Sequence, residues 1–438
     1  MSGHLPSEAM ELLAAAIISN DATQVRQVLG SHPELKSKLN DPMPGAPFGG
    51  TALIAAVQRT NREMIDVLLA AGADINGRSH WWAGGFGVLD DDRGLASFLI
   101  VRGARVDAHA ASRLGMLDRL KELISANPAL LHARGGDGQT PLHFASTVEI
   151  VQYLLDQGAD IDARDVDHES TPAQWMVRDR QEVARYLVAR GCRTDILMAA
   201  ALGNLELVRR HLDADATSIR LNVSEENFPR QDPRAGGCIY FWTLGRNKPA
   251  HIIAREFGHE EVFRLLMERT PDDLKLAMAC ELGEEDLFQA LLVGRPDLVR
   301  RVSGGDDSKE AAEAHRKLAD AAQNNNTQAV RLMLAAGWPV DARGQHGGTP
   351  LHWASYHGNA AMVREILRYD PPIEHADNDF KATPLGWATH GSEHGPHRKT
   401  GDYVATVELL CAAGAKVPDD PPGTEPVKAV LRRYQRAR

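Results

Sequence analysis

The stretch GGTPLHWASYHG at residues 347–358 decides the fold of this chain. Its Thr-Pro pair starts a helix well, because the Thr hydroxyl accepts from exposed backbone N–H groups and Pro needs no hydrogen-bond partner in the first turn. Leu351 and Ala354 then fall on one face of that helix. Residues 361–367 place a second apolar stripe on a following helix. The stretch therefore predicts two short helices, each with one apolar face.

Versions of this stretch recur along most of the chain. They read GGTALIAA from Gly49, GQTPLHFA from Gly138, STPA from Ser170 and ATPLGWA from Ala382. Apolar runs follow them, and then phrases such as GAD at residues 72–74 and 158–160. A single helix pair cannot bury its apolar stripe alone, so neighbouring pairs must stack into one continuous core.

The pattern resembles the ankyrin repeat, a turn followed by two antiparallel helices over about 33 residues. The resemblance implies an all-α ankyrin-repeat solenoid of about 11–12 helix–turn–helix units with irregular insertions. It also implies that the His at the fourth position of the motif hydrogen-bonds within and between the turns. That position is occupied by His143, His251 and His352, which are therefore expected to be structural.

The irregular parts suggest how the solenoid is organised. We expect N-terminal repeats over residues 1–221, with an irregular Gly- and Trp-rich loop at 77–93, and an irregular insertion at 222–247. We expect C-terminal repeats over residues 248–417, with a His-rich insertion at 390–403, and a capping helix with a basic tail at 418–438.

Composition narrows the class of protein. The chain has 438 residues, 43% of them hydrophobic, and contains no apolar run long enough to cross a membrane. Its four cysteines are scattered singly, which favours a reducing compartment over a disulfide framework. The net charge of −10 argues against nucleic-acid binding, which needs a basic face. We therefore expect a cytoplasmic protein with no nucleic-acid or membrane partner.

The first irregular stretch, residues 79–93, stands where the first helix of a repeat should be. Its aromatic side chains, Trp81, Trp82 and Phe86, are candidate ligand-binding groups, since an aromatic ring in a Gly-rich loop is a common recognition device. Alternatively, the rings fill the space left by the missing helix. Four residues of this stretch are candidates for acid–base catalysis: His80, Asp90, Asp91 and Asp92. The three carboxylates could also ligate a metal ion, or they can simply cap the helix that follows.

The second irregular stretch, residues 222–247, ends in the aromatic run CIYFW. A long insertion in a compact array is usually functional or disordered, and the aromatic run argues against disorder. A β-hairpin or an extended finger is consistent with the sequence, and Tyr240 and Trp242 are candidate ligand-binding residues. Local packing over a distorted junction is the alternative.

The third irregular stretch is rich in histidine. His390, His394 and His397 are spaced as on a helix, but Gly391, Gly395 and Pro396 argue against a helix there. The three imidazoles could ligate zinc or a similar ion if folding brought them together, and the alternative is a solvated polar loop. We assign no metal and no cofactor from the sequence. Further candidates for ligand binding lie on or beside the regular repeats: Trp353, His357, Trp387 and His390.

Two functions are consistent with these patterns. The first is a cytoplasmic ankyrin-repeat scaffold that binds a protein or peptide in its concave groove. The alternative is an enzyme or small-molecule receptor built on the stack, with an aromatic-lined pocket and Asp or His groups for lyase, isomerase, cyclase or hydrolase chemistry. The sequence leaves catalysis open, because it contains no familiar catalytic motif. A binding groove should be open, whereas an enzyme pocket should be closed, aromatic and centred on a carboxylate or His.

Overall fold

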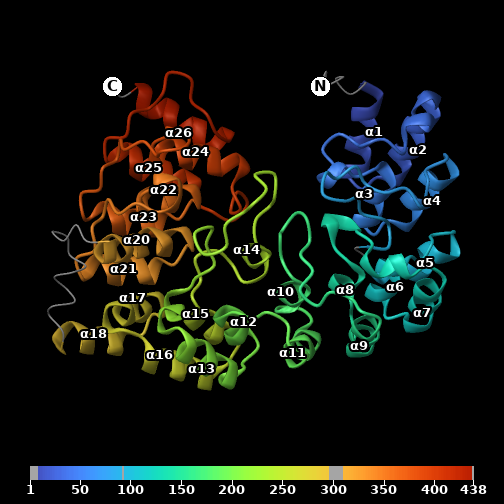
Figure 1. Ribbon diagram of the computed structural model, residues 1–438. Helices are drawn as coiled ribbons and strands as arrows, with labels where there is room; N and C mark the ends of the chain where they lie inside the picture. The colour runs from blue at the N-terminus through green and yellow to red at the C-terminus, as the bar shows by residue number, and fades with distance from the viewer. Residues whose placement is uncertain (1–7, 91–92, 295–308, 437–438) are drawn as a thin grey trace. The chain divides into compact units, whose positions relative to one another are not determined.

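A computed structural model describes residues 8–90, 93–294 and 309–436. Helices are the only regular elements in these ranges, and no strand occurs in them (Figure 1). They account for 59% of the described residues, well above the roughly 30–35% of an average soluble domain. The all-α repeat fold expected from the sequence is therefore confirmed.

The chain forms two compact units. The N-terminal unit comprises the chain up to Asp215 together with Leu221–Lys248, and the C-terminal unit comprises Ala216–Arg220 together with the chain from Pro249 onward. The irregular insertion at residues 222–247 thus belongs to the N-terminal unit.

The N-terminal unit is built from short helices that mostly follow one another in antiparallel pairs. In chain order they are α1 (Glu8–Ile18), α2 (Ala22–Ser31), η1 (Pro33–Lys38), η2 (Pro47–Gly49), α3 (Ala52–Gln58), α4 (Arg62–Ala70), η3 (Arg93–Leu95), α5 (Ala96–Val101), α6 (Ala108–Leu114), α7 (Leu117–Ala126), η4 (Pro128–His132), η5 (Gly136–Gly138), α8 (Pro141–Phe144), α9 (Val148–Asp156), α10 (Pro172–Met176), α11 (Gln181–Ala189), α12 (Ile196–Ala201), α13 (Leu205–Ala214) and α14 (Tyr240–Thr243).

The C-terminal unit continues the same pairing. Its helices are η6 (Ala216–Arg220), α15 (Ala250–Glu256), α16 (Glu260–Arg269), α17 (Asp272–Leu282), α18 (Glu285–Gly294), α20 (Lys309–Gln323), α21 (Thr327–Ala335), η7 (Gln345–Gly347), α22 (Pro350–Tyr356), α23 (Ala360–Leu367), α24 (Pro384–His394), α25 (Tyr403–Ala412) and α26 (Glu425–Arg436).

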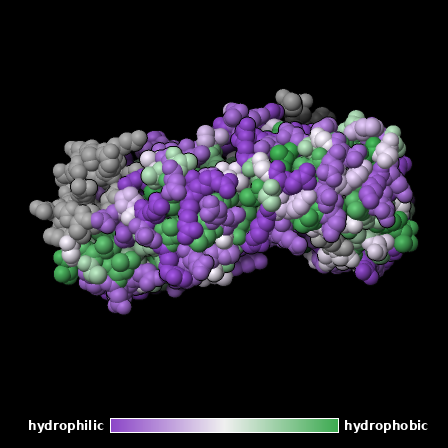
Figure 2. Space-filling view, turned by 60° about the horizontal axis from the view of Figure 1, so that its bottom comes forward, coloured by the Kyte–Doolittle hydropathy of each residue, from purple (hydrophilic) through white to green (hydrophobic). Residues whose placement is uncertain are grey.

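Local chemistry explains where these helices begin. Thr349 precedes α22 and shares a reciprocal cap with His352, while Pro350 occupies the first turn. The second helix of the same repeat, α23, starts after Asn359, whose side chain accepts from the Met362 N–H at 2.9 Å. The apolar stripes of both helices are fully buried between neighbours. On the face shown in Figure 2, hydrophilic residues accordingly predominate over hydrophobic ones.

The motif histidines join one turn to the next. His352 Nδ1 accepts from the Thr349 N–H at 3.1 Å, and its Nε2–H donates to the Ala382 carbonyl at 3.2 Å. His143 repeats this arrangement with Thr140 and with the Ser170 carbonyl. Burial lowers the pKa of His352 to about 4, so its ring stays neutral at physiological pH.

Replacing His352 with Ala should lower the free energy of unfolding by about 1–2 kcal/mol at pH 7, because buried partners lose their hydrogen bonds. The difference should shrink as the pH falls from 6.5 toward 4. In that pH range His352 becomes protonated in the unfolded chain but not in the folded chain, so the free energy of unfolding of the wild type falls as the pH falls. The variant has no His352 and does not lose this part of its stability. Denaturant unfolding across that pH range measures both effects. His394→Ala, at a side chain 64% exposed, is the control, and equal losses in the two variants would contradict this role.

Two local expectations need correction. The His-rich stretch is helical as far as His394, because Gly391 lies inside α24 rather than ending it. The reason is close packing: a Cβ atom at Gly391 would lie 2.3 Å from the Tyr356 carbonyl oxygen. The second irregular stretch is not a β-hairpin. It is a loop that carries α14, and its base is closed where the Val223 N–H donates to the Lys248 carbonyl at 3.1 Å.

Candidate functional site

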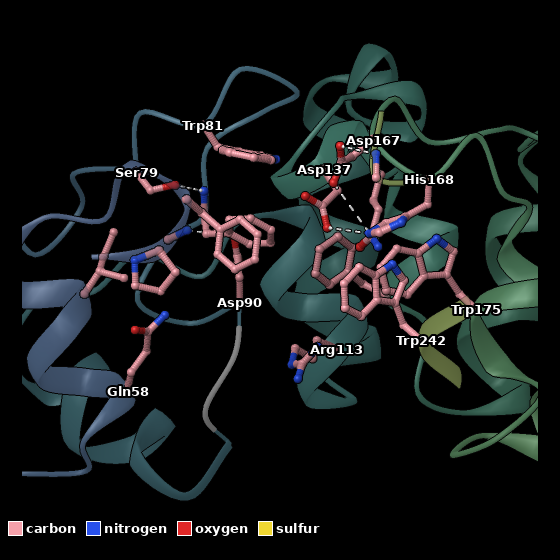
Figure 3. A pocket seen from close by; sticks show the side chains of 18 of the residues that line it. Gln58, Ser79, Trp81, Asp90, Arg113, Asp137, Asp167, His168, Trp175 and Trp242 are labelled. Atoms are coloured by element: carbon pink, nitrogen blue, oxygen red, sulfur yellow. Dashed lines mark hydrogen bonds and ion pairs between the residues drawn. The ribbon is translucent and has the colours of Figure 1, made fainter. Parts of the chain in front are cut away.

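A cavity of about 520 Å³ lies within the N-terminal unit (Figure 3). Most of its lining comes from three parts of the chain: η2 and α3 with the Gly- and Trp-rich stretch, α8 and α10 with the turns that precede them, and the insertion at residues 222–247. Arg113 of α6 also contributes. The first two irregular stretches therefore meet over one space. The His-rich stretch lies in the other unit.

The Gly- and Trp-rich stretch folds into a loop that rests on the turn at η5. Ser79 and Phe86 close the loop, since the Ser79 N–H donates to the Phe86 carbonyl at 2.8 Å and the Phe86 N–H donates to the Ser79 hydroxyl at 2.9 Å. The carbonyl of Gly84 accepts from the Asp137 N–H at 3.2 Å. Gly84 has φ +135°, and a Cβ atom there would lie 2.1 Å from the Gly135 carbonyl oxygen. Only glycine allows this approach.

The carboxylate of Asp90 anchors the same loop. It accepts from the Gly87 N–H at 2.7 Å and pairs with Arg78 at 2.8 Å. Burial raises the pKa of Asp90, and the Arg78 guanidinium opposes that rise. Asp90 also lines the cavity. The other acid–base candidates of this stretch are placed differently: His80 is exposed and donates to the Asn40 carbonyl, and Asp91 and Asp92 lie outside the described residues.

Aromatic rings form much of the cavity wall. Trp81 and Phe86 lie against Phe48, with ring centroids 5.1 and 5.5 Å apart. On the opposite wall in Figure 3, Trp175 and Trp242 flank the His168 imidazole at 5.1 and 6.5 Å.

Two aromatic candidates lie elsewhere. Trp82 does not line the cavity. Its ring packs against the guanidinium of Arg234, whose Cζ atom is 4.4 Å from the ring centroid, and Arg234 does line the cavity. Tyr240 is fully buried, and its hydroxyl donates to the Asp195 carboxylate at 3.0 Å. Asp195, but not Tyr240, lines a second, more polar cavity of about 400 Å³.

Two carboxylates and an imidazole meet in the wall of the cavity. Asp137, Asp167 and His168 each offer one ligand atom, and these atoms all lie within 4.8 Å of one another. We call these three residues the Asp/His cluster. The His168 Nε2 atom is 3.6 Å from an Asp167 oxygen and 3.9 Å from an Asp137 oxygen. Both carboxylates are buried.

Backbone hydrogen bonds hold the cluster in place. The carbonyl of Asp137 accepts from the N–H groups of Val166 at 2.8 Å and Asp167 at 3.1 Å, which clips two consecutive turns together. His168 Nδ1 donates to the Gly237 carbonyl at 2.9 Å, and the Gly236 N–H donates to the Asp167 carboxylate at 3.1 Å. The insertion at residues 222–247 therefore sets the orientation of both side chains.

Burial gives this region unusual acid–base properties. It raises the pKa of Asp137 to about 6, against the opposing charge of His168. Asp165 lies in the turn that carries Asp167 and His168. Burial raises the pKa of Asp165 to about 7, although the Trp175 indole N–H donates to its carboxylate. Groups of this kind can exchange protons near neutral pH or hold a cation.

The sequence led to part of this site. Trp81, Phe86, Asp90 and Trp242 were candidates and line the cavity, whereas Asp137, Asp167, His168 and Trp175 were not proposed as site residues. One signal was present in the sequence. In DVDHESTP at residues 165–172, five residues separate the first Asp from the Thr-Pro pair, whereas in GGDGQTP at residues 135–141 four residues separate the first Gly from that pair.

A smaller cavity of about 370 Å³ lies in the C-terminal unit. Three of the candidates line it, Trp353, Trp387 and His390, together with His346, Tyr356 and Phe380. Its turns correspond to those of the main site: Asp377 accepts the Trp387 indole N–H at 2.9 Å, as Asp165 accepts that of Trp175, across the same spacing of ten residues. His346, like Asp137, has a positive φ.

The remaining histidine candidates do not gather. His357 is buried and donates to the Gln323 carbonyl at 2.9 Å, and burial lowers its pKa to about 4. The His397 ring lies against His357, whereas His390 lies against His394. Among the described residues, the Asp/His cluster alone has the spacing of a metal-ligand group.

Comparison with known protein families agrees with the repeats. A family model described as ankyrin repeats (3 copies) matches residues 108–197 and 318–419, and one described as ankyrin repeat matches residues 48–80. These ranges together span about half of the chain. The chain belongs to the ankyrin repeat family. No helix in the described part of this ankyrin repeat protein is both long and apolar enough to cross a membrane.

Curated relatives share only the repeats. The chain is 33% identical over 105 residues to E3 ubiquitin-protein ligase XB3 of Oryza sativa subsp. japonica, which is 24% of this chain and 22% of that protein. It is 30% identical over 86 residues to Palmitoyltransferase Hip14 of Drosophila melanogaster, covering 20% of this chain and 12% of that protein. It is also 30% identical over 126 residues to Ankyrin repeat and SAM domain-containing protein 6 of Mus musculus, covering 27% and 14%. The chain thus spans less than a quarter of each of these relatives.

Proposed function

We propose that the N-terminal unit is an enzyme that binds a small organic molecule in the 520 Å³ cavity and acts on it at the Asp/His cluster. One observation carries this proposal: two irregular stretches, far apart in the sequence, line a single cavity whose wall includes two buried carboxylates and an imidazole. A scaffold that recognises a protein surface has no need of buried acid–base groups in a pocket of this size. The proposal thus favours the second of the two functions considered from the sequence.

The two kinds of residue that line the cavity suggest two different roles in binding a substrate. Trp81, Trp175 and Trp242 offer flat apolar surface for the carbon skeleton of a substrate, and the Asp/His cluster faces its polar, reacting end. Buried carboxylates and an imidazole can transfer protons to and from a bound molecule, or hold a cation that polarises it. Both modes are consistent with the lyase, isomerase, cyclase and hydrolase chemistry considered above.

Trp242 offers a test with little effect on folding, because its side chain lines the cavity while the residue is 67% exposed. Full-length protein is screened by thermal shift against a panel of small polar metabolites, and each hit is followed by calorimetry and by mass spectrometry for product. Trp242→Ala should weaken binding of a hit by about tenfold, the effect of losing one aromatic surface, and leave the unfolding midpoint nearly unchanged.

Phe380→Ala is the matched control, because Phe380 is a comparably exposed ring at the cavity of the C-terminal unit. It should leave the affinity of the hit unchanged. Hits that bind both variants as tightly as the wild type would place the ligand outside the N-terminal cavity and contradict the proposal.

A second role rests on the repeats themselves. Ankyrin repeats generally mediate contacts between proteins, and residues 318–419 match the family without a long interruption. We propose that the C-terminal unit binds a protein or peptide on the concave side of these repeats, in the cytoplasm, where four buried free cysteines stay reduced. Retention of a peptide partner by the full chain, and its loss when a charge is introduced by Tyr356→Glu in α22 or His390→Glu in α24, at two side chains that are not buried, would test this role.

A further inference from the structure

We propose that the Asp/His cluster is a metal centre, in which Asp137, Asp167 and His168 bind one divalent first-row cation such as Zn²⁺ or Mn²⁺. Because it assigns a cofactor to the same cavity, this inference rests on the proposed function. It differs from the expectation drawn from the sequence, in which no metal was assigned and the metal-ligand candidates were His390, His394 and His397, with Asp90–Asp92 as a further alternative.

The spacing of the ligand atoms is the first argument. His168 Nε2 lies 3.6 and 3.9 Å from its two carboxylate oxygens, too far for hydrogen bonds. Neighbouring ligands of a metal with bonds of about 2.0–2.2 Å are themselves about 3.0–3.6 Å apart. The imidazole therefore stands at or just beyond the separation from each carboxylate that a shared cation imposes, and the carboxylate atoms lie within 4.8 Å of each other, so an inward movement of the side chains would complete the coordination.

The hydrogen bonds around the cluster are those of a metal site. His168 donates its Nδ1–H to the Gly237 carbonyl, which leaves the lone pair of Nε2 directed at the two carboxylates. The Gly236 N–H engages the Oδ1 atom of Asp167 and leaves its Oδ2 atom facing His168. Imidazoles that ligate metals are commonly oriented by a backbone carbonyl in this way.

Asp137 supplies the independent observation. The residue is only 7% exposed and lines the cavity, and its Oδ1 atom makes no hydrogen bond of normal geometry in the described structure, although the Trp81 indole acts on the same carboxyl. A buried carboxylate oxygen without a partner is costly. Figure 3 shows the Asp137 side chain directed into the space that it shares with Asp167 and His168. A cation bound by the Oδ2 atom, which faces His168, would neutralise this carboxylate and offset the cost of burying its unpaired Oδ1 atom.

Charge balance points the same way. Asp137 and Asp167 are both buried, and within the described residues His168 is the cationic partner that comes within 4.0 Å of either carboxylate. One divalent cation neutralises two carboxylates and leaves the imidazole neutral. Two oxygen donors and one nitrogen donor suit Mn²⁺, Fe²⁺ or Zn²⁺ better than the softer Cu⁺ or the harder Ca²⁺.

The backbone is already arranged for binding. Asp137 has φ +54° between Gly136 and Gly138, and Cβ atoms at those glycines would lie 2.3 Å from the Phe86 ring and 2.2 Å from Val166. These contacts fix the turn that carries Asp137 against both the loop and the next turn. Three protein ligands leave the other coordination positions for a group of the substrate, which the cation would polarise as a Lewis acid.

The test uses the full chain, freed of metal by a chelator and titrated with Mn²⁺ by electron paramagnetic resonance and with Zn²⁺ by calorimetry. We expect one strong site per chain. Asp137→Asn and Asp167→Asn, which keep the shape of each side chain, should each weaken it by at least about 30-fold. Asp379→Asn is the matched control, because Asp379 occupies the turn position in the C-terminal unit that Asp167 occupies in the main site. It should bind as the wild type does.

A stability measurement separates loss of a ligand from loss of the fold. In chelator, Asp137→Asn should be at least as stable as the wild type, because it removes a buried charge. Added Zn²⁺ should raise the unfolding midpoint of the wild type and not that of the variant. Absence of a strong site in the wild type, or equal affinity in the Asp137 and Asp379 variants, would overturn the proposal.

The two proposals fail in different ways. If small molecules bind the cavity and are turned over in the presence of chelator, the metal centre is refuted and the enzyme stands. If the metal binds as described while no molecule of the panel binds the cavity or is turned over, the metal centre stands and the proposed function fails.

Discussion

Gly84→Ala should detach the Gly- and Trp-rich loop from the turn at η5 and dismantle the cavity. The new Cβ atom would lie 2.1 Å from the Gly135 carbonyl oxygen, a backbone atom that cannot swing away, and φ +135° is itself strained for Ala. We expect the free energy of local opening to fall by about 2–3 kcal/mol, which corresponds to a rise of about 30- to 160-fold in amide exchange over residues 79–90. Binding at the cavity should fall with it.

Gly72→Ala is the control that isolates the clash. Gly72 has a comparably positive φ of +103°, but a Cβ atom there meets nothing within 4 Å. Hydrogen exchange measured by mass spectrometry should therefore change locally at Gly72 and leave residues 79–90 protected. If the two variants leave the loop equally protected, the loop does not depend on the contact with Gly135.

Asp377→Ala should be among the most damaging single changes in the C-terminal unit, lowering its free energy of unfolding by about 3–5 kcal/mol. The Asp377 carboxylate accepts from the N–H groups of Asp379, Phe380 and Ala382 and from the Trp387 indole. Burial raises the pKa of Asp377, but these donors outweigh it and hold the pKa below its usual value. The wild type should therefore keep this stability down to the pKa of an unfolded Asp, about 3.9, and lose it as the pH falls further, through the lower pKa of the folded Asp377.

Denaturant unfolding followed by tryptophan fluorescence measures this loss. Asp379→Ala is the comparison, because its carboxylate is 55% exposed and binds only the His346 ring at 2.7 Å. It should cost less than about 1 kcal/mol. Equal losses from the two substitutions would mean that the turn does not depend on the four donors.

The sequence predicts the repeats because each repeat carries its own signals. A Thr-Pro cap, an apolar stripe and a closing glycine are local, so they can be recognised without knowing which other segments lie nearby. Gly391 shows the limit of this reasoning. Its position suggests a break in the helix, but the glycine is needed because α24 passes close to Tyr356, and that proximity is a property of the packed structure.

The residues of the candidate site also fall into those with a local sequence signal and those that only the packed structure reveals. The breaks in the repeat drew attention to Trp81 and Trp242, which line the cavity. Asp137 and Asp167 stand in turns that read as ordinary connections between repeats, where Asp and Gly are common for conformational reasons alone. Their proximity arises from hydrogen bonds between consecutive turns and from the insertion that orients His168. No spacing along the chain encodes that meeting.

The hydrogen bond from His168 to the Gly237 carbonyl joins residues 69 positions apart. The helices between them, α10 to α13, contact mainly their sequence neighbours, so they can form as they leave the ribosome. The cluster, in contrast, is complete only after the chain has been made well beyond residue 237. Completion of the Asp/His cluster is thereby separated in time from the growth of the stack, and a nascent chain that ends before the insertion holds the repeats without the complete cluster.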